Sequence, residues 1–253
     1  MASVQLGSTQ LLDRGCIPPA YGTRVVGGQD AARSPWMAYL IRNNAFACGG
    51  SLITHRFVLT AAHCTQLNDN LIVRLGEYDA STTWDGPTEE FRAILIFRHA
   101  NYETQRYNND IAMLKLDRIV QYKANIRPIC ILLNPNLRAT INRIQEFVLT
   151  GWGQTSPFYP VMPTRLQHMS VTRYNYPLCY NQVEKICASN PSKFACSGDS
   201  GSPLGAHVMY NFTKIFAQFG VASTVTSCLG YGIYTDVFHH TPWILEVMRL
   251  YRN

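Results

Sequence analysis

Short hydrophobic runs, separated at close intervals by turn-forming residues, make up most of the chain. The runs are rich in β-branched and aromatic residues, and glycine or proline punctuates them. They cover residues 36–42, 51–61, 71–75, 92–97, 111–116, 147–149, 166–171, 214–221 and 233–237. Strands of this length with frequent turns are typical of an antiparallel sandwich or barrel. The pattern therefore predicts an all-β fold.

The two ends of the chain have other patterns. Thr241 followed by Pro242 is a helix-start signal, and Trp243, Val247 and Leu250 then recur at helical spacing. We predict a terminal amphipathic helix over residues 241–251 that packs on the barrel through these side chains. Residues 1–24 are polar and hold several prolines and glycines, which predicts a flexible leader.

Composition narrows the class of protein. Of the 253 residues, 47% are hydrophobic and 15% charged, which favours a sizeable core and argues against disorder. The net charge of +6 comes from scattered basic residues without aromatic interleaving, so we expect no nucleic-acid partner. No apolar run is long enough to span a membrane, and we expect no membrane partner.

Eight cysteines point to an oxidising compartment. Their number is even and none has the Cys-x-x-Cys spacing of a zinc site, so we predict disulfides, although spacing alone leaves the pairing open. The sequon Asn211-Phe212-Thr213 agrees with a secreted glycoprotein. The first ten residues show no signal peptide, and we still expect an extracellular location because of the cysteines.

Three short motifs carry residues of one chemistry. His63 lies in Thr-Ala-Ala-His-Cys, Asp110 in Asn-Asp-Ile-Ala, and Ser200 in Gly-Asp-Ser-Gly. Each alone has a plain reading as a turn, cap or loop residue. Together they supply a nucleophile, a base that titrates near neutral pH, and an acid that orients the base.

These motifs, in this order, resemble those of the chymotrypsin-fold, trypsin-like serine proteases. The resemblance runs from about Val25 to the C-terminus, in a style similar to secreted insect clip-type proteases without the clip domain. It implies two antiparallel six-stranded β-barrels with a C-terminal α-helix. The barrels would cover about residues 25–128 and 129–240, in a protease domain of residues 25–253 after the leader.

The resemblance also implies roles for individual residues. His63 would be the general base, Asp110 the orienting acid and Ser200 the nucleophile, and the N–H groups of Gly198 and Ser200 would form the oxyanion hole. Cleavage after Arg24 would free the Val25 ammonium to pair with Asp199 and so activate a zymogen. The implied disulfides are Cys16–Cys130, Cys48–Cys64, Cys179–Cys187 and Cys196–Cys228.

The substrate pocket departs from the family's pattern. Trypsin-like enzymes carry an aspartate six residues before the nucleophile, where this chain has Phe194, followed by Ala195. Phe194 would lie at the pocket floor, Ser223, Thr224 and Val225 on one wall, and Gly232 on the other wall. We predict a preference for small or moderate apolar residues rather than Arg or Lys, or a pocket too obstructed for efficient turnover.

Two further features differ from relatives. Ser202 replaces a glycine of the family, and serine would cost stability if the position needs a positive φ or close packing. The acidic segment from Glu77 to Glu90 lies where relatives bind calcium through glutamates, but its ligand spacing does not match. We expect a solvated loop, no metal and no cofactor, with calcium at this loop as the alternative.

The sequence thus predicts a monomeric serine endopeptidase that acts on proteins or peptides and is activated by an upstream protease. A serpin-type inhibitor is an expected further partner. The alternative is a weak or inactive protease homologue that acts as a regulatory binding module, since the pocket residues are unusual. An α/β-hydrolase is excluded because no βαβ alternation is visible and the order of the three residues differs. A structural domain with a coincidental triad is remote.

Overall fold

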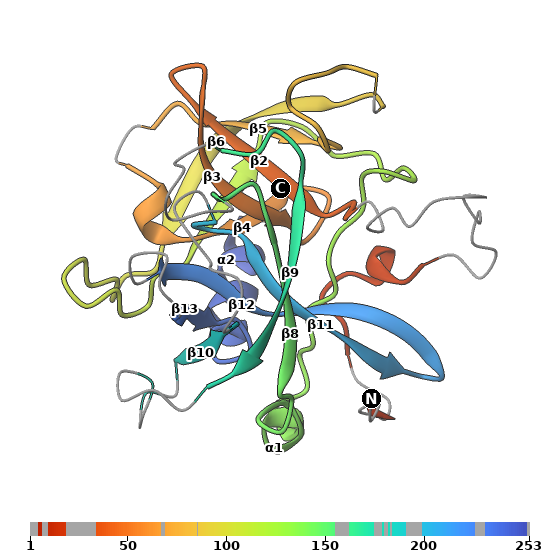
Figure 1. Cartoon of the computed structure of the whole chain (residues 1–253), viewed down its shortest axis with the longest axis vertical. Coiled ribbons are helices and arrows are strands. Elements are labelled where there is room, and N and C mark those ends of the chain that lie inside the picture. The colour runs from red at the N-terminus through yellow and green to blue at the C-terminus, as the bar shows by residue number, and fades with distance from the viewer. Residues whose placement is uncertain are drawn as a thin grey trace.

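Two barrels stacked one above the other form the molecule (Figure 1). The computed structural model describes residues 5–6, 10–18, 34–66, 69–84, 86–154, 162–174, 179, 182, 184–190, 199–225 and 231–251. Each barrel has its own cluster of buried apolar side chains, and the N-terminal segment runs along the second barrel.

The first barrel is closed by six antiparallel strands. They are β2 (Met37–Arg42), β3 (Ala45–Leu52), β4 (Phe57–Thr60), β5 (Ile72–Leu75), β6 (Glu89–Arg98) and β7 (Ala112–Leu116), in the order β2-β3-β4-β7-β6-β5. The hairpin between β2 and β3 turns through Asn43 and Asn44, both with positive φ, as a two-residue turn of this kind requires. Fully buried Leu40, Leu59 and Val73 fill the interior.

The second barrel also has six antiparallel strands. They are β8 (Glu146–Gly151), β9 (Gln167–Arg173), β10 (Lys185–Ser189), β11 (Pro203–Tyr210), β12 (Thr213–Val225) and β13 (Tyr231–Asp236). Pairing of β11 with β8 closes the ring, and β1 (Gln5–Leu6) adds to β11 in parallel. The two barrels confirm the predicted fold class.

Several strand predictions need correction. The run over residues 51–61 is not one strand, because β3 ends at Leu52 and β4 begins at Phe57, whose N–H donates to Thr54 Oγ1 across the turn (3.2 Å). None of the predicted runs covers β1, β10, β11 or residues 45–50 of β3. β11 begins inside a run of turn-forming residues, so local composition concealed it.

The C-terminal helix α2 spans Thr241–Leu250 and confirms the predicted helix. The N-cap residue of this helix is His240 rather than Thr241. The Thr241 hydroxyl donates to the Phe238 carbonyl (3.0 Å). Ile244 and Val247 form the buried face, whereas Leu250, which we placed on that face, is 58% exposed. The other helices of the described residues are short: η1 (Arg14–Cys16), η2 (Ala62–Cys64), η3 (Pro135–Leu137) and α1 (Arg138–Ile141).

Residues 10–18 of the leader are docked, and the prediction that they are flexible was wrong. Leu12 N–H donates to the Ile131 carbonyl (3.0 Å), and the Asp13 carboxylate accepts from the Tyr122 hydroxyl (2.5 Å). Arg127 donates to the carbonyl of Gly15 (2.9 Å). These contacts lie far apart in the sequence, so the polar composition of the leader gave no sign of them.

Among the described residues, no helix is long and apolar enough to cross a membrane.

Candidate active site

His63 and Asp110 form a close pair at the junction of the barrels. His63 lies in the 3-10 turn η2, directly after β4, and Asp110 precedes β7. The His63 backbone N–H donates to Asp110 Oδ1 (2.9 Å), and its ring Nδ1 lies 2.7 Å from Oδ2. The Asp110 side chain is fully buried and the His63 side chain is 23% exposed, so the base can be reached from solvent.

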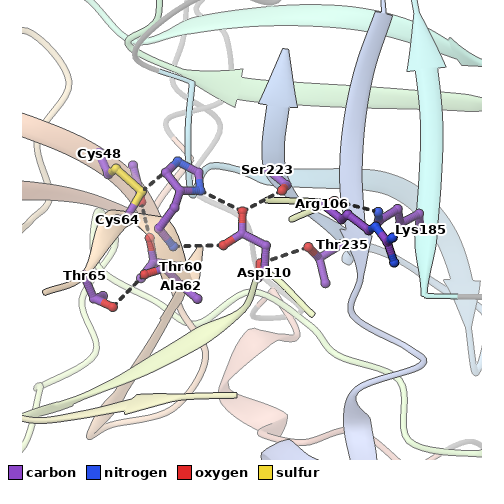
Figure 2. Close-up of polar contacts among 12 residues, drawn as sticks. Cys48, Thr60, Ala62, Cys64, Thr65, Arg106, Asp110, Lys185, Ser223 and Thr235 are labelled. Atoms are coloured by element: carbon purple, nitrogen blue, oxygen red, sulfur yellow. Dashed lines mark hydrogen bonds and ion pairs between the residues drawn. A yellow bond between two sulfur atoms is a disulfide. The ribbon is translucent and has the colours of Figure 1, made fainter. Parts of the chain in front are cut away.

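Side chains of the second barrel complete the surroundings of Asp110. The Ser223 hydroxyl donates to Asp110 Oδ2 (2.5 Å), and the Thr235 hydroxyl donates to the Asp110 carbonyl (2.9 Å). In Figure 2, Asp110 has Cys48 and Cys64 on one side and Ser223 and Thr235 on the other. A carboxylate bound in this way fixes the tautomer and orientation of the imidazole.

Ser200 lies in a turn that contacts the first barrel. Its carbonyl accepts from the Gly49 N–H of β3 (2.8 Å), and Gly201 N–H donates to the Ala222 carbonyl of β12 (2.8 Å). Gly201 has φ of 78°, and a Cβ there would lie 2.2 Å from Thr60 Oγ1 and 3.3 Å from Cys64 Sγ. Only glycine fits this position, and the close approach sets the Ser200 turn against the turn that carries His63.

Asp199 is buried directly before Ser200. Its Oδ1 accepts a hydrogen bond from Gly153 N–H (3.1 Å), and its carbonyl accepts one from Ser202 N–H (2.9 Å). Burial and the nearby Asp199 charge raise the pKa of Tyr234. A Cβ on Gly153 would overlap the Asp199 carboxylate, at 2.3 Å from its carbon. The carboxylate is therefore buried against Gly151 and Gly153 at the end of β8, and it does not lie in a solvated loop.

Two costs were considered for Ser202, a backbone with positive φ and close packing, and only close packing applies. Ser202 is absent from the residues with positive φ, so the backbone does not demand glycine. Its hydroxyl is fully buried, finds no hydrogen-bond partner within the described part of the chain, and lies 2.1 Å from where a Cβ on Gly49 would be. The expected cost thus comes from close packing and an unsatisfied hydroxyl.

Three of the four implied disulfides are present in the structure. Cys48–Cys64 joins β3 to the His63 turn, Cys16–Cys130 ties the leader to the protein, and Cys179–Cys187 reaches β10. The pair Cys196–Cys228 lies outside the described residues. So do Arg24, Val25, Gly198, Phe194 and Ala195, as does the side chain of Val225.

A small hollow of about 10 Å³ lies beside Ser200. Ser223, Thr224, Ile233 and Tyr234 are among its lining residues. The volume accommodates about one water molecule. The hydroxyls of Thr224 and Tyr234 find no partner among the described residues. Gly232 has no room for a side chain, because a Cβ there would lie 2.5 Å from the Tyr234 hydroxyl.

Sequence reasoning missed several residues of this region. The Tyr107 ring packs edge-on to the His63 ring, with 5.7 Å between centroids. Its position three residues before Asp110 was a usable signal. Thr235 and Ile233 carried none, because they come from a strand more than 100 residues further along the chain.

The described carboxylates of the acidic segment from Glu77 to Glu90 form ion pairs with the chain's own cations. Arg74 donates to Glu77 Oε2 (3.2 Å) and to Glu90 Oε1 (2.6 Å), and Lys123 pairs with Glu89. Hydrogen bonds from Ser81 and Arg165 hold the pKa of Asp79 well below its usual range. The carboxylates of Glu77, Asp79, Glu89 and Glu90 therefore point at cationic side chains and hydroxyls rather than into solvent alone.

The geometry as a whole defines a class of protein. A solvent-accessible imidazole is bound to a fully buried carboxylate, and its Nε2 lies 3.8 Å from Cys64 Sγ. The serine-bearing turn approaches Cys64 through Gly201. This is the arrangement of serine hydrolases of the chymotrypsin type.

Comparison with known proteins agrees with this class. Residues 25–244 match the Trypsin family, and the chain belongs to that family. It is 30% identical to the serine protease grass of Drosophila melanogaster over 89% of this chain and 68% of that protein. It is 31% identical to phenoloxidase-activating factor 3 of Holotrichia diomphalia, over 90% and 73% respectively. Proclotting enzyme of Tachypleus tridentatus is 32% identical over 89% of this chain and 66% of that protein.

Proposed function

We propose that the protein is a secreted serine endopeptidase that forms an acyl-enzyme on Ser200. The observation that carries the proposal is the His63–Asp110 pair, in which Asp110 accepts from both the backbone and the ring of His63. A base held in this way can take the proton of a serine hydroxyl at neutral pH.

The proposed reaction has two halves. Ser200 Oγ attacks the substrate carbonyl as His63 takes its proton, and the N–H groups of Gly198 and Ser200 bind the oxyanion. His63 then gives the proton to the leaving amine, and the C–N bond breaks. Water repeats the sequence on the acyl-enzyme and regenerates Ser200. The steps transfer protons and an acyl group without a change of oxidation state, so we propose that no cofactor takes part.

Activation is proposed to follow cleavage after Arg24 by an upstream protease. The new Val25 ammonium would then pair with the Asp199 carboxylate. Burial of Asp199 supports this, because a buried carboxylate favours a cationic partner. The disulfides and the exposed Asn211 in the turn between β11 and β12 support secretion through an oxidising compartment.

For the bond that is cut, we propose small or moderate apolar residues on its acyl side. The hollow beside Ser200 is small and its lining residues include Ile233, which supports this preference. The same hollow favours the second candidate function, a regulatory homologue with little turnover. In the acidic segment, we propose that Arg74 supplies the positive charge that calcium supplies elsewhere.

A covalent probe tests the proposal. The protein is cleaved after Arg24 and treated with a fluorophosphonate, alongside the variants Ser200→Ala and His63→Ala. We expect labelling of the cleaved wild type alone. Absence of labelling in the cleaved wild type would favour the regulatory homologue. A peptide series with Arg, Leu, Phe, Val or Ala before the scissile bond then tests the pocket, and fastest cleavage after Arg would contradict our prediction.

A further inference from the structure

The loop that ends at Asp110 has an unusual backbone. Tyr107 has φ of 52° and Asn109 has φ of 51°, in the left-handed region that side chains with a Cβ disfavour. Such residues persist when contacts from elsewhere hold them. Asn109 directly precedes Asp110, so whatever holds Asn109 also sets where the Asp110 carboxylate points.

The holding contacts come from two consecutive residues of the second barrel. Glu184 Oε2 accepts a hydrogen bond from the Asn109 N–H (2.7 Å). The Lys185 ammonium donates to Asn108 Oδ1 (2.7 Å) and to the Arg106 carbonyl (3.0 Å). Figure 2 shows Lys185 beside Arg106, on the side of Asp110 away from the Cys48 and Cys64 pair. The Glu184 carboxylate thus binds one backbone N–H of the loop, and the Lys185 ammonium binds two of its oxygens.

Both residues are anchored in the sheet. The Glu184 carbonyl accepts from Asp236 N–H (2.8 Å), and Lys185 pairs with Thr235 in the β10–β13 ladder. Thr235 is the residue whose hydroxyl donates to the Asp110 carbonyl (2.9 Å). The loop is therefore attached on both sides of Asp110 to one rigid pair of strands in the barrel that also carries Ser200.

We propose that Glu184 and Lys185 are positioning residues that hold Asp110 at His63 by clamping residues 106–109 across the barrel junction. This inference rests on the proposed role of Asp110. Among the described residues, the hydrogen bonds of these two side chains run to Asn109, Asn108 and Arg106 rather than to His63 or Ser200. Their effect would therefore pass through Asn109 and Asn108.

Isosteric variants separate positioning from mere packing. Glu184→Gln keeps an oxygen that can accept from the Asn109 N–H, whereas Glu184→Ala removes it. Lys185→Met keeps the aliphatic stem and removes the three donors. Glu246→Ala, at an exposed position on α2, is the matched control for loss of a glutamate.

The readouts are kcat and KM on a peptide amide, and the downfield NMR resonance of the His63 Nδ1 proton. We expect Glu184→Ala to lower kcat about 10-fold to 100-fold with KM nearly unchanged, because small misplacement of a catalytic group has effects of this size. Glu184→Gln should stay within about twofold of wild type, and Lys185→Met should fall between them. In the two impaired variants the His63 proton resonance should shift or broaden.

The NMR readout keeps this inference separate from the proposed function. If wild type shows no turnover, the His63 resonance still reports the bond to Asp110. An unchanged resonance in both Glu184→Ala and Lys185→Met overturns the clamp, and so does equal kcat for Glu184→Ala and Glu184→Gln. If Glu184→Ala does not fold, Lys185→Met and Glu184→Gln decide between the two outcomes.

Discussion

A buried histidine beside the Asp110 loop should make the protein sensitive to acid. His240 is only 2% exposed, and its Nε2 lies 3.1 Å from Asn109 Oδ1. Burial lowers the pKa of His240 to about 4, and the nearby His239, His99 and Arg138 also disfavour the charged ring. The Asp236 carbonyl, 2.8 Å from Nδ1, raises the pKa but does not overcome burial.

The sign of the effect follows from proton linkage. The folded pKa lies below the ordinary value of 6.5, so the unfolded chain binds more protons between these two values. The stability that comes from burying neutral His240 is present above pH 6.5 and is lost as the pH falls toward 4. The full difference corresponds to about 3 kcal/mol, and about 2.5 kcal/mol of it is lost by about pH 4.5.

The assay is urea unfolding of wild type and His240→Gln at about pH 7.5 and about pH 4.5. Glutamine does not titrate, so the variant should lose about 2.5 kcal/mol less than wild type between the two conditions. Other groups titrate equally in both proteins and cancel in this difference. His239→Gln removes an exposed neighbour that contributes less than burial to the lowered pKa of His240, so this variant should keep most of the wild-type pH dependence. An equal pH dependence of wild type and His240→Gln would refute the reasoning.

Three further changes test separate contacts, each by urea unfolding. Ser202→Ala removes a buried hydroxyl without a described partner and should raise the free energy of unfolding by about 1 kcal/mol; a loss would show that the hydroxyl is satisfied. Tyr122→Phe deletes the hydrogen bond to Asp13 and should lower the free energy of unfolding by about 2 kcal/mol. An unchanged free energy would mean that this contact of the docked leader adds no stability. Arg74→Met should lower the free energy of unfolding by about 0.5–1 kcal/mol, because the ion pair with Glu90 is lost. A chelator should leave the melting temperature of wild type unchanged.

Sequence reasoning could find residues whose chemistry sits in a short motif. His63, Asp110 and Ser200 each lie beside small residues that the local turn needs, and Gly201 in particular has no room for a side chain. Their joint occurrence predicted the fold as well, because the barrels follow from the same resemblance.

The supporting contacts could not be predicted in this way. Glu184 reaches Asn109 across 75 residues and Thr235 reaches Asp110 across 125, and neither residue type is unusual where it stands. Strand β11 was concealed for a related reason. Its first residue is a proline at the end of a turn-rich run, and only pairing with β8 and β12 makes it a strand.

The central claim is that Ser200 carries the acyl group during hydrolysis, after cleavage at Arg24. Pre-steady-state hydrolysis of a chromogenic ester by the cleaved protein, with acid quenching and intact mass analysis, tests it most directly. We predict a burst of about one product per chain and one acyl group on Ser200, with neither in Ser200→Ala nor in the uncleaved chain. Steady hydrolysis without a burst, or an acyl group on another residue, would contradict the account.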